Sequence, residues 1–176
     1  ARMIGGESVP PAMCYYSKLK GTGGKCRCCL VDVTKGSEAD PRPMPKLVAS
    51  CVTGCQDGME IASKSSERVT EARKAVTEFL LINHPLDCPV CDQAGECDLQ
   101  NLSFEHGKSQ TRFIEEKRTF EPEDIGPYIQ LHMNRCIVCQ RCVEVADQLT
   151  DKRVHGVLNR GDHSHISTCV SAAIDN

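Results

Sequence analysis

Thirteen cysteines in 176 residues dominate the chemistry of this chain, and most of them fall into groups with metal-binding spacing. The first group is Cys14-x11-Cys26-x2-Cys29, and Cys51 follows after 21 intervening residues. A close cysteine pair on a glycine-rich loop, with a remote cysteine on a strand, suits a cluster held by four thiolates. A zinc ion held by the same four cysteines is the alternative.

Glycines and two spare cysteines accompany the first group. Gly21, Gly23 and Gly24 lack side chains, so the backbone there can wrap closely and aim N–H donors at sulfur. The same run gives only a weak signal for NAD or flavin binding, because it does not follow a strand as a phosphate loop would. Cys28 lies between two proposed ligands and should point the opposite way. We predict that Cys28 and Cys55 are not ligands.

The second group combines one histidine with three cysteines: His84-x3-Cys88-x2-Cys91-x5-Cys97. Three kinds of site have this composition: a zinc knuckle, a disulfide loop, and a redox cluster in which nitrogen replaces one sulfur ligand. The odd number of cysteines fits a secreted disulfide framework poorly. Zinc and iron–sulfur chemistry therefore both stay open for this group.

The third group is Cys136-x2-Cys139-x2-Cys142, a tight repeat that favours a [4Fe–4S] cluster over zinc. In two-cluster ferredoxins the run continues with three residues and then Cys-Pro, but Ala146 stands at that position here. A single cluster is therefore expected, with its fourth ligand further along the chain. The only later cysteine is Cys169.

Composition excludes several classes of function. The net charge of −3 gives no support for a nucleic-acid surface. Aromatic residues make up 4% of the chain and tryptophan is absent, so a thin core stabilised by metals is expected. Apolar runs such as residues 79–82 are far shorter than the roughly 20 residues that cross a bilayer. A cytosolic, metal-bearing chain fits best.

Periodicity predicts the elements that position these groups. A helix is expected over residues 66–83, capped by Ser66 and ended at His84 by the following proline. Its apolar stripe comprises Val69, Ala72, Val76, Phe79 and Leu80. Short strands are expected at 30–33, 47–53 and 59–62, a polar connector at 117–130, and a short helix after Asn134 that carries Val138, Cys142, Val145 and Ala146. The histidines at 106, 132, 155, 163 and 165 are expected at the surface or at partner contacts.

Four motifs in series resemble one family. CYYSKLKGTGGKCRCCLV, LVASCVTGCQDG, NHPLDCPVCDQAGECDLQNL and IGPYIQLHMNRCIVCQRCV are similar, in order, to the N-terminal part of the large iron–sulfur subunit of NADH:quinone oxidoreductase, respiratory complex I. The resemblance covers about residues 9–160. It implies an α+β fold of three small modules: a β-grasp [2Fe–2S] ferredoxin-like domain at 1–64 without its opening hairpin, a [4Fe–4S] domain with one histidine ligand at 65–104, and a [4Fe–4S] ferredoxin-like module at 105–176.

The resemblance also implies the ligands. They are Cys14, Cys26, Cys29 and Cys51 for a [2Fe–2S] cluster, His84, Cys88, Cys91 and Cys97 for a [4Fe–4S] cluster, and Cys136, Cys139 and Cys142 for a second [4Fe–4S] cluster. The fourth ligand of the last cluster is expected beyond residue 176 rather than at Cys169. A nitrogen ligand at His84 removes roughly one negative charge from its cluster, which raises the potential, as in Rieske centres.

The implied function is an electron relay with no substrate site of its own. Electrons would come from NADH through flavin in a partner subunit of the peripheral arm and pass toward quinone. The chain would bind no nucleic acid and would not enter the membrane. It would lie at the cytoplasmic face of a bacterial inner membrane, or on the matrix side in mitochondria. The alternatives are the same front end in a NAD-linked hydrogenase diaphorase, a formate dehydrogenase or an iron-only hydrogenase, and, in another class, a zinc-stapled interaction module.

Overall fold

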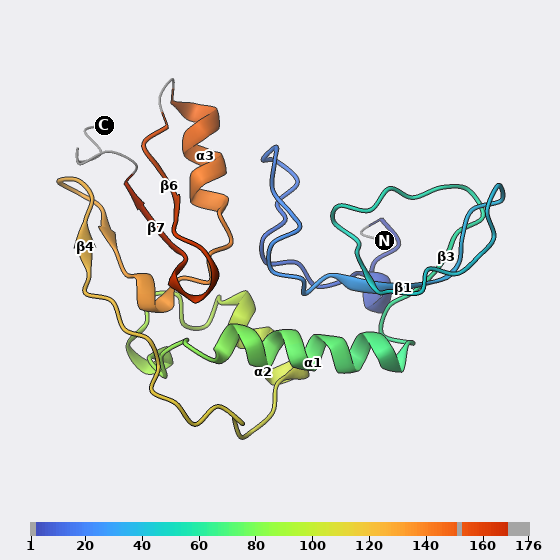
Figure 1. The fold of residues 1–176 in the computed structure, drawn as a ribbon, viewed down its shortest axis with the longest axis horizontal. Helices are drawn as coiled ribbons and strands as arrows, with labels where there is room; N and C mark the ends of the chain where they lie inside the picture. Colours follow the sequence, from blue (N-terminus) through green and yellow to red (C-terminus); the bar gives the residue numbers. More distant parts are fainter. Residues whose placement is uncertain (1–2, 151–152, 169–176) are drawn as a thin grey trace.

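Three small antiparallel sheets and three α-helices make up the part of the chain that the computed structural model describes, residues 3–150 and 153–168. This confirms the expected α+β class. Figure 1 shows the first sheet and the C-terminal hairpins at opposite ends of α1. The elements are, in chain order, η1 (Gly6–Ser8), β1 (Leu30–Lys35), β2 (Val48–Ala49), β3 (Glu60–Ala62), α1 (Glu67–Leu81), η2 (Cys88–Val90), α2 (Asp98–His106), β4 (Glu123–Asp124), β5 (Gln130–Leu131), η3 (Met133–Arg135), α3 (Arg141–Leu149), β6 (His155–Leu158), η4 (Gly161–His163) and β7 (His165–Thr168).

The first sheet has the order β2-β1-β3, so β1 is its central strand. Val31 and Val33 of β1 are buried, as expected for a central strand. All three predicted strands are present, but the one expected at 47–53 is only two residues long. It ends because the chain turns back: the Val52 N–H and the Thr53 hydroxyl both donate to the Ala49 carbonyl oxygen.

Helix α1 begins at Glu67 and ends at Leu81, close to the predicted limits. Ser66 occupies the N-cap position, but its hydroxyl donates to the Asp32 carboxylate at 2.9 Å and not to the helix. At the other end, the Lys117 ammonium donates to the Leu81 carbonyl oxygen at 3.0 Å. The His84 N–H also donates to that oxygen, at 3.2 Å, so the histidine is held just past the helix end.

The apolar stripe predicted for α1 is wrong in part. Phe79 is 74% exposed, whereas the buried positions are Val69, Arg73 and Thr77. Arg73 is only 2% exposed, because its guanidinium donates to the Leu30 carbonyl oxygen at 3.1 Å and to the Ser63 hydroxyl at 2.8 Å. The face of α1 that carries Arg73, and not the predicted apolar stripe alone, therefore packs toward the first sheet.

We expect Arg73→Ala to lower the free energy of unfolding by about 3 kcal/mol, because it deletes a buried side chain and leaves its acceptors without partners. Urea denaturation followed by circular dichroism measures the change. Lys74→Ala is the control, since the neighbouring Lys74 makes only an exposed ion pair with Glu71 and should change stability by less than about 1 kcal/mol. Equal effects of the two variants would contradict the anchoring role of Arg73.

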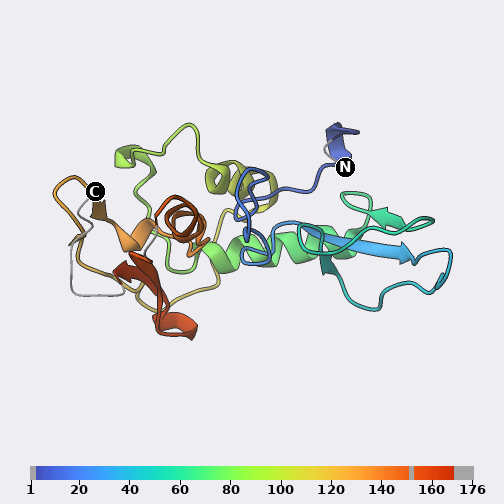
Figure 2. The same cartoon turned by 90° about the horizontal axis from the view of Figure 1, so that it is seen from above.

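The main apolar cluster joins distant parts of the chain. Met13, Cys14, Cys26, Cys28, Leu99 and Leu102 form its buried part, and Val76, Leu80, Leu81, Cys97, Ile137 and Cys139 pack against it. It therefore collects cysteines from all three groups. Figure 1 shows the N-terminal loop, in blue, beside α3 and above the α1–α2 pair, and Figure 2 shows the same loop from above, over that pair. The small core lies where the three cysteine groups meet.

The C-terminal part consists of hairpins around α3. β4 pairs with β5 inside the segment predicted to be an irregular connector, and β6 pairs with β7. The prediction that the helix after Asn134 carries Val138 is wrong, because α3 begins at Arg141 and Val138 lies in the loop before it. Two of the histidines expected at the surface are buried: His106 is 9% and His155 is 8% exposed. Within the described ranges, no helix has the length and apolar character needed to cross a bilayer.

Candidate metal centres

The four cysteines of the first group come together around the Gly21–Gly24 loop. Cys14, Cys26 and Cys29 are buried, and Cys51 is half-buried. The Cys29 and Cys51 sulfurs are 3.2 Å apart, and the Cys26 N–H donates to the Cys14 sulfur at 3.4 Å. Burial raises the pKa of Cys51, and the neighbouring Cys29 and Cys14 raise it further. The four predicted ligands therefore lie as two close pairs, Cys29 with Cys51 and Cys14 with Cys26, near enough for Cys14 to act on the pKa of Cys51.

Glycine is required in this loop. The Gly24 N–H donates to the Cys51 sulfur at 3.2 Å, which is the kind of donor expected from the sequence. Gly23 and Gly24 have φ values of 116° and 71°, in the region that side chains disfavour. A Cβ atom at Gly23 would also lie 3.4 Å from the Cys51 sulfur and 3.2 Å from Val52 Cγ1. The bare backbone thus lets the loop close over the sulfurs.

Cys28 and Cys55, the predicted non-ligands, lie in different surroundings. Cys55 is exposed. Cys28 is buried in the apolar core, with its sulfur 3.5 Å from the Met13 sulfur. It does not point fully away from the first group, because its thiol hydrogen-bonds Cys26 and thereby lowers the pKa of Cys26. The same bond and burial raise the pKa of Cys28 itself. The two pKa values therefore shift in opposite directions, and the lowered value at Cys26 favours its thiolate.

The second group surrounds a small cavity. Its lining contains the histidine and all three cysteines of the group, together with four other residues: His84, Asp87, Cys88, Cys91, Ala94, Cys97, Gln100 and Arg135. Local structure places each predicted ligand. His84 follows α1, Cys88 opens the 3-10 helix η2, and Cys97 is the N-cap of α2. One nitrogen and three sulfurs around a central space fit the donor set of a cluster with a single histidine ligand.

His84 has the protonation state that a ligand needs. Burial lowers its pKa, and the positive charge of Lys117 lowers it further, although Asp87 opposes the effect. The ring is therefore neutral at pH 7, and a neutral imidazole is the form that binds metals.

Cys136 and Cys139 of the third group lie on a tightly coiled loop before α3, and Cys142 lies in the first turn of the helix. Val138 and Gln140 have φ values of 52° and 64°, in the left-handed region that is uncommon for residues with side chains. This coiling lets the Val138 N–H donate to the Cys136 sulfur at 3.3 Å. Burial raises the pKa of Cys136. Cys169 lies outside the described residues, so its predicted exclusion from this site stays a prediction.

Two arginines that sequence reasoning missed stand next to cysteines of the third group. Arg135 precedes Cys136 and lines the cavity of the second group. Arg141 precedes Cys142 and hydrogen-bonds the backbone of the first group. Their adjacency to cysteines was the only signal in the sequence.

In the described part of the chain, no three His, Cys, Asp or Glu side chains gather around one point as ligands of a single metal ion.

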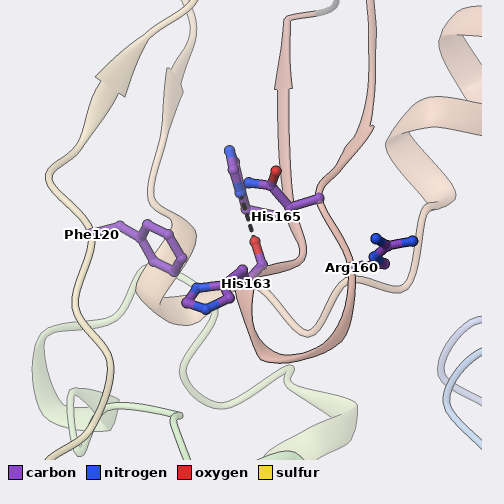
Figure 3. Close-up of a pocket in the computed structure, with 5 residues that line it drawn as sticks. Phe120, Arg160, His163 and His165 are labelled. Atoms are coloured by element: carbon purple, nitrogen blue, oxygen red, sulfur yellow. Dashed lines mark hydrogen bonds between the residues drawn. The ribbon is translucent and has the colours of Figure 1, made fainter.

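A separate groove contains none of the predicted ligands. Phe120, Asn159, Arg160, His163 and His165 line it. The Phe120 and His165 rings lie 5.7 Å apart, and His165 Nδ1 is 3.0 Å from the His163 carbonyl oxygen. Figure 3 shows the Arg160 guanidinium on the opposite side of the hairpin from Phe120 and His163. The polar groups do not converge on a common point.

Three protein-family models match the chain in succession. Residues 1–66 match the 2Fe-2S iron–sulfur cluster binding domain. Residues 73–112 match the NADH-ubiquinone oxidoreductase-G iron–sulfur binding region, and residues 126–176 match the ferredoxin-like domain of NADH-quinone oxidoreductase subunit 3. These domains correspond to one [2Fe–2S] and two [4Fe–4S] clusters, the cofactors expected from the sequence.

Relatives of known name agree with these domains. The chain is 43% identical over 166 residues to the G subunit of NADH-quinone oxidoreductase of Rickettsia typhi, and the match covers 94% of this chain. It is 45% identical over 178 residues to the mitochondrial 78 kDa subunit of NADH-ubiquinone oxidoreductase of Candida albicans, and that match covers 100% of this chain. The chain spans 23% of the length of each of these relatives.

A solved hydrogenase structure shares the fold. The NAD+-reducing [NiFe]-hydrogenase in the H2-reduced state matches with a TM-score of 0.78 and 28% identity, over 93% of this chain and 64% of the hydrogenase chain. The family domains and the named relatives are more specific than this structural likeness. On their combined match, the chain belongs to the family of the large iron–sulfur subunit of NADH-quinone oxidoreductase and carries the family's [2Fe–2S] and two [4Fe–4S] domains.

Proposed function

We propose that this chain relays single electrons through three iron–sulfur clusters of an NADH–quinone oxidoreductase. The observation that carries the proposal is the cavity of the second group, because one nitrogen and three sulfurs from a short loop surround it. The common apolar core supports it, since cysteines of all three groups pack there. Such an arrangement suits clusters that exchange electrons with one another.

The proposed ligands are those expected from the sequence. They are Cys14, Cys26, Cys29 and Cys51 for the [2Fe–2S] cluster, His84, Cys88, Cys91 and Cys97 for the first [4Fe–4S] cluster, and Cys136, Cys139 and Cys142 for the second. The division of the chain at residues 64 and 104 likewise remains a prediction. Bound clusters accept and release single electrons, at potentials that depend on the ligands and their hydrogen bonds.

The chain's own residues set the surroundings of each cluster. The N–H groups of Gly24, Cys26 and Val138 are directed at cysteine sulfurs, which stabilises negative charge there. Burial of Cys14 and Cys26 in the apolar core limits access of water to this part of the first site. The neutral His84 adds no charge to the second site. These features tune potentials and need no acid–base or nucleophilic residue.

Partners and location extend the same proposal. Membership of the family implies neighbouring subunits, and we propose that one of them binds NADH and flavin and delivers electrons to this chain. Quinone would be reduced elsewhere in the complex, so this chain needs no substrate site. The complex would hold the chain at the cytoplasmic face of a bacterial inner membrane or at the matrix side of the mitochondrial inner membrane.

The second candidate is the corresponding electron-transfer module of a NAD-linked hydrogenase, because the NAD+-reducing [NiFe]-hydrogenase shares the fold. Its identity of 28% is lower than the 43% to the Rickettsia typhi relative. Ala146 also stands where a two-cluster ferredoxin run would have its next cysteine. Both features favour the oxidoreductase over the hydrogenase.

Metal analysis and electron paramagnetic resonance (EPR) test the proposal. We expect iron and sulfide in the protein and three distinct cluster signals on reduction with dithionite. Oxidised protein serves as the control, because clusters of these types are magnetically silent in that state. Stoichiometric zinc without sulfide, and no signal on reduction, would instead indicate a zinc-stapled interaction module.

A further inference from the structure

We infer that Arg135 and Arg141 are positioning residues that tie the third cysteine loop to the loops of the other two clusters and so fix the cluster separations. The inference rests on the proposed function, because it concerns the geometry between the proposed ligand sets. Arg135 immediately precedes the first cysteine of the Cys136–Cys142 triplet, and Arg141 lies within the triplet, immediately before its last cysteine. Each reaches a different neighbour.

Arg141 reaches the first group. Its guanidinium donates to the Cys14 carbonyl oxygen at 3.4 Å and to the Tyr15 carbonyl oxygen at 2.9 Å. It also lies over the Tyr16 ring, 5.7 Å from the centroid. Arg141 is the residue next to Cys142, a proposed ligand of the third site. Its side chain binds the backbone at Cys14, a proposed ligand of the first site, and so connects the two sites.

The same face of α3 reinforces this contact. One and two helical turns beyond Arg141, Glu144 and Gln148 meet the same loop. Glu144 pairs with Lys25 at 3.4 Å, and Gln148 exchanges two hydrogen bonds of 3.1 Å with the Lys20 backbone. Glu144 also approaches Gly21 so closely that a Cβ atom there would lie 2.5 Å from its carboxylate oxygen. Helix α3 is therefore docked on the loop of the first group.

Arg135 reaches the second group. Its Nε donates to the Asp87 carboxylate at 3.1 Å, and Asp87 immediately precedes Cys88. Both partners are only partly exposed, at 24% and 36% of their side chains. Arg135 and Asp87 both line the cavity with the four proposed ligands. A residue of the third loop thus closes the wall of the second site.

The chemistry of arginine suits this role. Its planar guanidinium offers several donors in a fixed fork, so Arg141 can hold two successive carbonyl oxygens at once. A lysine has the charge but not the fork, and glutamine has neither the charge nor the reach. Arg135 and Asp87 are 48 residues apart in sequence, and Arg141 and Tyr15 are 126 residues apart. The loops are therefore joined here by side-chain contacts and not by a short stretch of chain.

The test uses the full-length subunit in the assembled oxidoreductase. In reduced protein, neighbouring clusters broaden and relax one another's EPR signals, and this interaction falls steeply with distance. We expect Arg141→Gln to weaken the interaction between the first and third clusters and to leave that between the second and third unchanged. Arg135→Gln should do the reverse. The g-values of each cluster should stay as in the wild type.

Amide hydrogen exchange gives a second readout. Losing a charge-assisted hydrogen bond should raise the equilibrium constant for local opening of the contacted loop about tenfold or more. Arg141→Gln should therefore speed exchange in residues 15–24, and Arg135→Gln in residues 85–88. Arg141→Lys should restore part of the magnetic interaction, because it keeps the charge.

Arg42→Gln is the matched control, since Arg42 pairs with Asp40 on an exposed loop and contacts no ligand. It should change neither readout. Unchanged interactions in both variants, equal weakening of both interactions in either variant, or loss of a cluster in both Arg141→Gln and Arg141→Lys would overturn the inference. These outcomes differ from failure of the proposed function, in which the wild-type complex itself would show no cluster signals from this chain.

Discussion

Replacing Cys29 with alanine is expected to abolish the [2Fe–2S] signal, whereas replacing its neighbour Cys28 leaves the signal in place. Cys29 lies 3.2 Å from Cys51, in the set of four buried or half-buried thiols around the glycine loop. Cys28 instead contacts the Met13 sulfur in the apolar core. Removing a ligand thiolate leaves an iron atom without its fourth bond, and such clusters are lost or assemble poorly.

EPR of the reduced protein and iron analysis measure the outcome. Cys29→Ala should lose about a fifth of the iron, which is the share of a two-iron cluster among three clusters of these types. Cys28→Ala is a matched control because it removes the same atoms from the adjacent position. It should cost about 1 kcal/mol of stability through the small cavity it leaves. A [2Fe–2S] signal that survives Cys29→Ala and disappears in Cys28→Ala would reverse the assignment.

A second large effect is expected at His84. His84→Cys should lower the midpoint potential of the second cluster by on the order of 100 mV, because a thiolate adds a negative charge that the neutral imidazole does not carry. Burial keeps His84 neutral in the native protein by lowering its pKa. EPR-monitored redox titration measures the shift. The potentials of the other two clusters should change little, since their own ligands are unaltered.

His163→Cys is the control for adding a thiol to the protein. His163 is exposed at 78% of its side chain and lies outside the cavity of the second group. The control should leave all three potentials unchanged. If His84→Cys also left the second potential unchanged, His84 would not be a ligand.

The sequence predicted the parts of the molecule that depend on short spacing. The cysteine groups, the glycine loop and helix α1 each lie within a short segment, so residue type and separation along the chain suffice to predict them. The His84 group is the clearest example: the helix stop, the proline and the three cysteines together predicted a loop whose four candidate ligands surround one cavity. The family domains then agreed with the cofactors expected from these spacings.

The buried face of α1 shows where periodicity failed. A hydrophobic pattern placed Phe79 in the core, yet Arg73 is buried and Phe79 is exposed. The burial of Arg73 depends on the Leu30 carbonyl oxygen and the Ser63 hydroxyl, which belong to the sheet and its following turn. A pattern within one helix contains no information about acceptors on another element. The same reason explains the buried His106 and His155.

By itself, the sequence determined which residues are candidate iron ligands and in which local loops they lie, because both depend on residue type and on spacing along the chain. Only the tertiary structure decided how the loops meet. It placed Arg135 beside Asp87 and Arg141 beside Cys14, contacts that span 48 and 127 positions. It also made Cys28 a buried hydrogen-bond donor to Cys26. Such contacts arise from the packing of separate modules on a shared core, which no local pattern encodes.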